Sequence, residues 1–171
     1  MKKKIAILGS TGSIGRQTLD IIKKNKKNFK VILLTANKNH NLLSKQIKEF
    51  KVKNVIIEDE KKYLNFKKKF KLKNINLFLG IKNIRKILKS KKIDYVINSI
   101  SGINGLEPTL NIIPNSKNIL IANKETIICG WNIIKKKLIK YKTNFVPIDS
   151  EHFSIWKLIK NEPRSSIDKV I

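Results

Sequence analysis

A glycine-rich turn near the N-terminus is the feature that most constrains the fold of this chain. Residues 9–15 read Gly-Ser-Thr-Gly-Ser-Ile-Gly, and they separate the apolar run 5–8 from a segment in which apolar residues recur at helical spacing from Ile14 onward. A strand, a glycine-rich turn and a helix in this order bring backbone N–H groups and a helix N-terminus to a phosphate. The spacing G-x-x-G-x-x-G differs from the common G-x-G-x-x-G. The turn therefore predicts either a dinucleotide site or a small-residue turn in an ordinary α/β domain.

The three glycines of this turn have separate expected roles. Gly9 permits a tight turn, Gly12 lets the backbone approach a ligand, and Gly15 lets the helix pack closely on the strand. Hydroxyl groups that would add donors to a phosphate come from three residues of the same turn, Ser10, Thr11 and Ser13.

Apolar runs and helical spacings alternate along the rest of the chain. Strand-like runs occupy residues 29–34, 54–57, 75–79, 93–97 and 118–122, and helical patterns occupy residues 42–50, 58–71, 84–88, 107–113 and 151–159. This alternation, which extends to about residue 147, predicts an α/β fold with a Rossmann-like, doubly wound, mostly parallel sheet. The small polar loop 98–105 follows one of the strands, where ligands bind in open α/β sheets.

The segment after the second predicted strand, residues 35–39, contains no acidic residue. In a dinucleotide-binding fold, an Asp or Glu at this place would hold the ribose hydroxyls of NAD. Lys38 lies there between Asn37 and Asn39, and a cation flanked by amide donors suits the 2′-phosphate of NADP. Alternatively, Lys38 is one more surface lysine in a chain that has 38 lysines and arginines.

The chain is strongly basic, with 38 Lys+Arg against 12 Asp+Glu and a formal net charge of +26. Such a charge raises the alternative of a basic nucleic-acid-binding domain. The lysines are spread along the chain, however, and aromatic residues make up only 7% and are not interleaved with them as base-stacking platforms would be. We therefore interpret the lysines as solvated surface positions and expect no specific nucleic-acid partner.

The cysteine content and hydropathy indicate the compartment. Cys129 is the only cysteine, which excludes an intramolecular disulfide and a multi-cysteine zinc site. No apolar run approaches the roughly 18 residues that a membrane helix requires. The N-terminal apolar run is too short for a signal peptide. These features predict a cytoplasmic protein without a membrane partner.

A second dense group of functional side chains lies at residues 146–152, Val-Pro-Ile-Asp-Ser-Glu-His. Asp149 and Glu151 are two residues apart, so in an extended segment they project to the same side. Two carboxylates with a hydroxyl between them suit a hard divalent cation, Mg²⁺ or Mn²⁺. The same acids could instead cap the predicted helix 151–159. Spacing alone leaves both alternatives open, and His152 adds no decisive evidence.

Three motifs together carry a resemblance to a known family. They are the turn 9–15, Leu-Ile-Ala-Asn-Lys-Glu at residues 120–125 and Pro-Ile-Asp-Ser-Glu-His at residues 147–152. In order and spacing the chain resembles the N-terminal part of the 1-deoxy-D-xylulose 5-phosphate reductoisomerase family. The resemblance implies an enzyme that rearranges this sugar phosphate and reduces the product with NADPH to 2-C-methyl-D-erythritol 4-phosphate, in the non-mevalonate isoprenoid pathway. Other NADP-dependent oxidoreductases, such as homoserine dehydrogenase, lack Asp-Ser-Glu-His after Asn-Lys-Glu.

The resemblance also implies residue roles. NADPH would be bound by Thr11, Gly12, Ser13, Ile14, Lys38, Asn39, Asn123 and Glu125. The substrate would be contacted by Lys124, Ser150 and Glu151. Mg²⁺ or Mn²⁺ would be held by Asp149 and Glu151, so the resemblance favours the metal role over the capping role. The catalytic residues would be Lys124, Asp149 and Glu151. The family usually has glycine in place of Asn37, which leaves open how the cofactor loop closes.

Two regions are expected from this resemblance. Residues 1–147 would form the NADPH-binding Rossmann-like domain, and residues 148–171 the incomplete start of an α+β catalytic domain that binds metal and substrate, with residues 166–171 as its first strand. A third metal carboxylate, the substrate-phosphate site and a mobile lid would lie beyond Ile171. This piece is therefore expected to bind NADPH weakly and not to turn over substrate, and the full-length enzyme is expected to be a homodimer.

Overall fold

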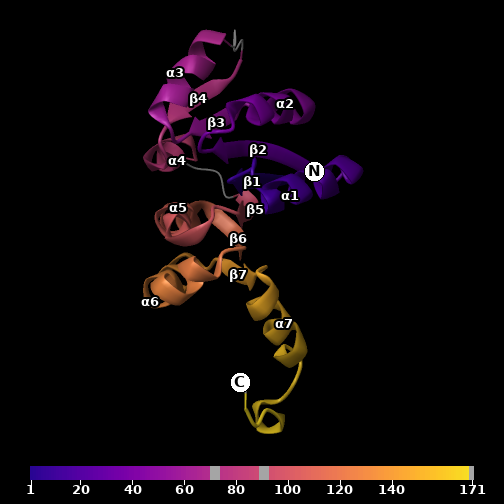
Figure 1. Cartoon of the computed structure of the whole chain (residues 1–171). Helices are drawn as coiled ribbons and strands as arrows, with labels where there is room; N and C mark the ends of the chain where they lie inside the picture. The colour runs from indigo at the N-terminus through magenta and orange to yellow at the C-terminus, as the bar shows by residue number, and fades with distance from the viewer. Residues whose placement is uncertain (70–73, 89–92, 170–171) are drawn as a thin grey trace.

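The computed structural model of the chain describes residues 1–69, 74–88 and 93–169. The strands of the described chain form a single parallel sheet in the order β4-β3-β2-β1-β5-β6-β7 (Figure 1). Their bounds are β1 Lys3–Leu8, β2 Phe29–Ala36, β3 Asn54–Ile57, β4 Asn76–Leu79, β5 Ile93–Asn98, β6 Ser116–Ile121 and β7 Asn144–Pro147. The chain winds outward from β1 to β4 and then returns to the other side of β1 at β5. The strand order therefore reverses between β1 and β5.

Helices cover both faces of this sheet. They are α1 Ser13–Lys24, α2 His40–Phe50, α3 Glu60–Lys69, α4 Ile84–Ile87, α5 Leu106–Ile112, α6 Lys124–Tyr141 and α7 Ser150–Ile159, with short 3₁₀ helices at Ile81–Asn83, Gly102–Gly105, Ile113–Asn115 and Arg164–Ser166. Helices α1, α2 and α3 bury apolar residues against one face, and α4, α5 and α6 against the other. Among the described residues, no helix combines the length and apolar character needed to cross a membrane.

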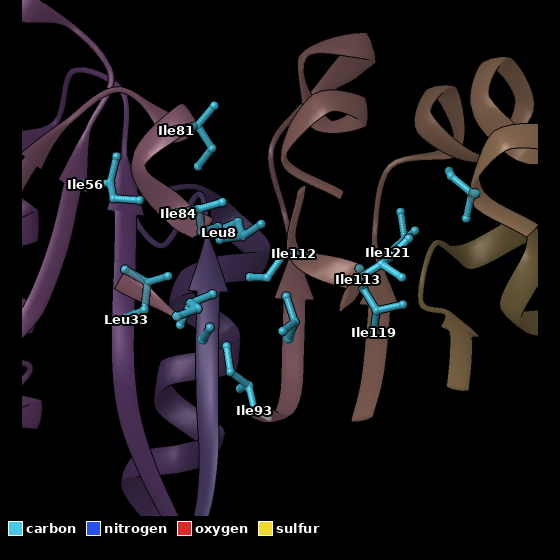
Figure 2. Close-up of a cluster of buried hydrophobic side chains, with 14 of the residues drawn as sticks. Leu8, Leu33, Ile56, Ile81, Ile84, Ile93, Ile112, Ile113, Ile119 and Ile121 are labelled. Carbon is cyan, nitrogen blue, oxygen red and sulfur yellow. The ribbon is translucent and has the colours of Figure 1, made fainter. Parts of the chain in front are cut away.

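The strands in the middle of the sheet are buried on both faces, which explains why they appear as continuous apolar runs. In β1, Ile5 and Ile7 belong to the core under α1 to α3, whereas Ala6 and Leu8 belong to the core under α4 to α6. Figure 2 shows part of the second core, where Leu8 from the sheet lies among isoleucines of neighbouring strands and helices. The predicted α/β, doubly wound, parallel sheet is confirmed.

Helix α3 begins two residues later than the pattern over residues 58–71 predicted. It begins at Glu60 because the Asp59 carboxylate accepts a hydrogen bond from the Lys62 N–H at 2.8 Å and so caps the helix. Phe66 is fully buried as expected, but Leu64 is 48% exposed and does not belong to the inner face. The predicted inner residue Phe70 and the predicted end at Lys71 lie outside the described residues.

The C-terminal segment differs from its sequence-based description. Asp149 has an extended backbone, but Ser150 and Glu151 are helical because α7 starts at Ser150, so Asp149 and Glu151 do not lie on one extended segment. The predicted strand 166–171 is wrong for its described part: Ser166 ends a 3₁₀ helix and residues 167–169 have no regular structure. A strand needs a neighbour to pair its backbone groups, and no described strand lies beside these residues. Residues 170 and 171 lie outside the described part. None of the residues of α7 is buried.

Candidate functional site

A cavity of about 850 Å³ lies at the carboxyl ends of the strands around the reversal of strand order. Three turns contribute to its wall: residues 9, 11 and 12 after β1, residues 35–37 at the end of β2, and residues 99–101 after β5. The far wall comes from the start of α5. In doubly wound sheets this crevice is where ligands bind.

Two glycines of the turn 9–15 cannot be replaced without strain. Gly9 has φ +77°, and a Cβ there would lie 2.9 Å from the Ser99 carbonyl oxygen. A Cβ on Gly15 would lie 2.5 Å from the Gly9 carbonyl oxygen. The expected tight turn at Gly9 and close packing at Gly15 are confirmed. Thr11 and Gly12 line the large cavity.

The N-terminus of α1 offers backbone donors at this cavity. Gly12 is its N-cap residue and has no side chain to cap it, and the first turn carries no acidic residue. The helical ladder starts with the Arg16 N–H donating to the Gly12 carbonyl at 3.0 Å. The N–H groups of residues 13–15 therefore precede the first intrahelical bond, as the first donors of any helix do. Such a helix start favours an anion.

The glycine-rich turn is fixed by hydrogen bonds to β2 and α2. The Gly9 N–H donates to Thr35 Oγ1 at 2.9 Å, and the Ser10 N–H donates to the Thr35 carbonyl at 2.8 Å. The Ser10 hydroxyl donates to Gln46 Oε1, and Gln46 Nε2 donates to the Ser10 carbonyl, both at 2.8 Å. Ser10 is fully buried, so the expectation that its hydroxyl would face a phosphate is wrong. Gln46 was not among the predicted site residues, because its spacing is that of an ordinary polar position in an amphipathic helix.

The segment between β2 and α2 lies at the edge of the same cavity. Asn37 lines the cavity, and Lys38 is exposed in the next position. Asn39 is the N-cap residue of α2, and its Oδ1 accepts the Leu42 N–H at 3.1 Å. The side-chain amide nitrogen of Asn39 and the ammonium of Lys38 are the donors that this segment would offer to a ligand.

A second cavity, of about 520 Å³, joins two motifs that lie far apart in the sequence. Its wall includes residues 123–125 at the start of α6 and residues 149–151 at the start of α7, together with Ile14 of α1. Residues 99–101 line both cavities. The structure thus brings most of the predicted site residues into two adjoining cavities. Ser99 and Ser101 were not among the predicted site residues, although the loop 98–105 was expected at a ligand.

Lys124 and Glu151 form an ion pair in the second cavity. Lys124 Nζ lies 2.9 Å from Glu151 Oε1, and the Ser150 hydroxyl donates to Glu151 Oε2 at 2.8 Å. The hydrogen bond from Lys124, followed by that from Ser150, lowers the pKa of Glu151 to about 2. The bond to Glu151 also raises the pKa of Lys124. At neutral pH the pair consists of a carboxylate and an ammonium, both about half exposed.

Asp149 caps α7, as the helix-capping alternative predicted. Its Oδ1 accepts the His152 N–H at 3.0 Å and lies 2.6 Å from His152 Nδ1. Its other oxygen, Oδ2, is buried and has no hydrogen-bond partner among the described residues. Buried polar atoms normally have a partner, so this oxygen is open to a ligand.

Asn123 has a similar free oxygen. Its Nδ2 donates to the Gly102 carbonyl at 2.7 Å and to Thr126 Oγ1 at 2.6 Å, which fixes the side chain in the wall of the second cavity. Its Oδ1 is buried without a partner in the described part of the chain. The same part contains no group of three or more His, Cys, Asp or Glu side chains suited to a metal ion.

The parallel strand order that reverses at β1 and β5, the glycine-rich turn and the open start of α1 define a doubly wound α/β domain of the dinucleotide-binding class. The model of the 1-deoxy-D-xylulose 5-phosphate reductoisomerase family matches residues 5–130. The chain is 54% identical over 169 residues to the reductoisomerase of Pelagibacter ubique and 40% identical over 169 residues to that of Thermoanaerobacter pseudethanolicus. The chain belongs to the 1-deoxy-D-xylulose 5-phosphate reductoisomerase family. The alignments cover 98% and 99% of this chain but only 44% of each relative.

Solved structures agree with this assignment. The reductoisomerase of Zymomonas mobilis in complex with NADPH superposes with a TM-score of 0.81 at 30% identity, covering 89% of this chain and 40% of that protein. A reductoisomerase in complex with NADPH, fosmidomycin and magnesium gives a TM-score of 0.84 at 28% identity, covering 94% and 40%. Homoserine dehydrogenase of S. aureus, at 18% identity and a TM-score of 0.50, shares the fold alone.

Proposed function

We propose that this chain forms the NADPH-binding part and the start of the catalytic part of an enzyme that converts 1-deoxy-D-xylulose 5-phosphate to 2-C-methyl-D-erythritol 4-phosphate. One observation carries the proposal. Residues 123–125 and residues 149–151 line one cavity, which adjoins the cavity of the glycine-rich turn through residues 99–101. A nicotinamide nucleotide and a metal-bound sugar phosphate must meet in this way for hydride transfer.

The first cavity suits the nucleotide. The pyrophosphate would lie at the start of α1, on the N–H groups near Thr11, Gly12, Ser13 and Ile14. Lys38 and Asn39 would hold the adenosine end with its 2′-phosphate. Asn123 and Glu125 would hold the other end at the second cavity, where the unpaired Oδ1 of Asn123 offers an acceptor.

The second cavity fits a divalent cation. Asp149 presents a buried oxygen without a described partner, and Glu151 is ionised at all ordinary pH values. Carboxylate oxygens beside the Ser150 hydroxyl are the donor set that Mg²⁺ or Mn²⁺ prefers. When bound by Asp149 and Glu151, such a cation would polarise the substrate carbonyl and stabilise the developing alkoxide.

The chain's own residues would orient the sugar phosphate. Lys124 stays protonated because Glu151 raises its pKa, so its ammonium can bind substrate oxygens and stabilise negative charge on them. Ser150 can donate a hydrogen bond to the same substrate. The loop 99–101 would separate the reacting atoms from the adenosine end of the nucleotide.

We further propose that the cofactor-binding domain covers residues 1–147 and that residues 148–171 begin the catalytic domain. This boundary is supported by the end of β7 at Pro147 and by α7, which contributes no buried residue. The 171-residue chain should bind NADPH weakly. With only two carboxylates at the metal site it should hold a metal ion poorly, and it should therefore show no turnover. The homodimer and the cytoplasmic location of the complete enzyme remain predictions.

Titration of this chain with NADPH, followed by nicotinamide fluorescence, tests the proposal directly. We expect saturable binding of NADPH, weaker binding of NADH, and no oxidation of NADPH when substrate and Mg²⁺ are added. Absence of NADPH binding would contradict the cofactor role. Full steady-state activity of the 171-residue chain would contradict the expectation that it lacks essential groups.

The net charge of +26 supports a second candidate, a nucleic-acid-binding domain. DNA binding measured over a range of salt concentrations separates the two. Weak binding that disappears as salt rises and depends on no base sequence is expected of any chain with this charge. Sequence-selective DNA binding together with a failure to bind NADPH would favour the second candidate.

A further inference from the structure

Gln46 is buried in α2, with 5% of its surface exposed, and both ends of its side-chain amide are used on one residue of the glycine-rich turn. Its Oε1 accepts the Ser10 hydroxyl and its Nε2 donates to the Ser10 carbonyl. Ser10 is fully buried and separates Gly9 from Thr11. A side chain from 36 residues away therefore fixes the backbone of the turn at its centre.

Only a side chain that both donates and accepts satisfies this pair of contacts. A leucine at position 46 would leave the Ser10 hydroxyl and carbonyl buried without partners. A glutamate would keep an acceptor for the hydroxyl but would place a carboxylate against the carbonyl oxygen. Leaving buried groups unpaired is costlier than losing a surface hydrogen bond, so the turn would move to find new partners.

The contact also ties the turn to the element that follows Lys38. Helix α2 begins at His40, directly after Lys38 and Asn39. Thr35, at the end of β2, accepts hydrogen bonds from the N–H groups of Gly9 and Ser10. The turn at the phosphates thus depends on α2, whereas the start of α2 is capped by Asn39 and does not use the Ser10 contact.

We propose that Gln46 is a positioning residue for nucleotide binding: it touches no ligand, and it holds the turn 9–12 so that Thr11 and Gly12 face the pyrophosphate. This inference rests on the proposed NADPH site. It predicts that Gln46 affects the affinity for ligands that reach the turn and leaves the affinity for ligands confined to the adenosine end unchanged.

The test uses the 171-residue chain with Gln46→Leu, Gln46→Glu and a matched control, Thr143→Val. Thr143 is also buried and its hydroxyl bonds two backbone carbonyls, of Ile113 and Ser116, but it lies at the amino end of β7, away from both cavities. In fluorescence titrations, we expect the Kd for NADPH to rise roughly tenfold in both Gln46 variants, the effect of losing a buried hydrogen bond or two. Thr143→Val should lose thermal stability and keep the wild-type Kd.

A second ligand separates positioning from general damage. Adenosine 2′-monophosphate carries the 2′-phosphate but no pyrophosphate, and its binding can be followed by NMR chemical shifts. Its Kd should be equal for wild type and for Gln46→Leu. A parallel loss for both ligands would mean that α2 itself is disrupted, and it would overturn the positioning role.

Ser10→Ala provides a milder variant if the Gln46 variants do not fold. It removes one of the two hydrogen bonds and should raise the Kd for NADPH about two- to threefold. An unchanged Kd in Ser10→Ala or in folded Gln46→Leu would overturn the inference while leaving the cofactor site intact. Wild-type chain that binds no NADPH would instead refute the proposed function.

Discussion

Lys38 is exposed between β2 and α2 and would carry the preference of the chain for NADPH over NADH. Lys38→Glu would replace a cation by an anion at the expected 2′-phosphate. We expect the Kd for NADPH to rise tenfold or more, roughly the worth of a charge-assisted hydrogen bond, with little change for NADH. Parallel titrations with both nucleotides measure this difference.

Lys45→Glu is the matched control for this prediction. Lys45 is an exposed lysine of α2 and does not line either cavity, so the substitution changes the net charge by the same amount at another position. It should leave the ratio of the two Kd values close to that of the wild type. An equal loss of NADPH and NADH affinity in Lys38→Glu would show that this lysine does not recognise the 2′-phosphate.

Asp94 gives the stability of the domain a dependence on acidic pH. Its carboxylate binds the Lys117 ammonium and the Lys4 N–H, both at 2.8 Å, and so connects β5 to β6 and β1. The Lys117 bond, followed by the Lys4 bond, lowers the pKa of Asp94 below its ordinary value of 3.8. A carboxyl whose pKa is depressed in the folded state stabilises it fully above 3.8, and this contribution is lost as the pH falls through the lower, folded-state pKa.

Denaturant unfolding of wild type and Asp94→Asn over a pH series measures this contribution. The difference in unfolding free energy between the two proteins should be constant above about pH 5 and should shrink as the pH falls below about pH 4. A difference that stays constant throughout the acidic range would mean that the contacts of Asp94 do not depend on its charge.

At the scale of single elements, α7 should unfold independently of the sheet. Asp149 caps it, and none of its residues is buried. Asp149→Ala should cost about 1 kcal/mol of local helix stability, as loss of an N-cap does. Hydrogen exchange of the α7 amides should accelerate accordingly, while exchange of the β1 amides stays unchanged.

Ser154→Ala provides a control within the same helix. It removes an exposed hydroxyl that bonds the Ser150 carbonyl, and it does not touch the cap. Its effect on amide exchange in α7 should be smaller than that of Asp149→Ala. Equal acceleration in α7 and in β1 would show that the helix is part of the cooperative core.

The strands were largely predictable from the sequence because burial on both faces makes them short continuous apolar runs. Helix α6 was missed because its apolar residues do not form one stripe. Ile127 and Ile134 are buried, but Ile128, Ile133 and Ile139 are exposed on other sides of the helix. The helical period is therefore blurred, and tertiary packing decides which isoleucines lie inside.

The site was predictable where its residues are close in sequence. The motifs at residues 9–15, 123–125 and 149–151 each follow a strand, and parallel strands end at the same edge of a sheet. Gln46 could not be found in this way, because its partner Ser10 is 36 residues distant and nothing local distinguishes Gln46 from a surface residue. The roles of these residues toward NADPH and metal stay predictions.

At the scale of the whole molecule, the net charge of +26 should destabilise the folded state through repulsion among lysines. Salt screens such repulsion, with a Debye length of roughly 10 Å at 0.1 M ionic strength. The midpoint of thermal unfolding should therefore rise between low and moderate NaCl concentrations. Lys38→Glu should show the same rise, which would separate general screening from anion binding at that lysine. A midpoint that is constant or falls with salt would contradict the prediction.

Residues 99–101 form part of the wall of both cavities. Because both cavities share this loop, the loop cannot be redesigned for one cavity alone. A substitution at residues 99–101 that enlarges one cavity also changes the shape of the other. Engineering a new nucleotide preference or a new small-molecule preference should therefore begin at residues that line only one of the two cavities.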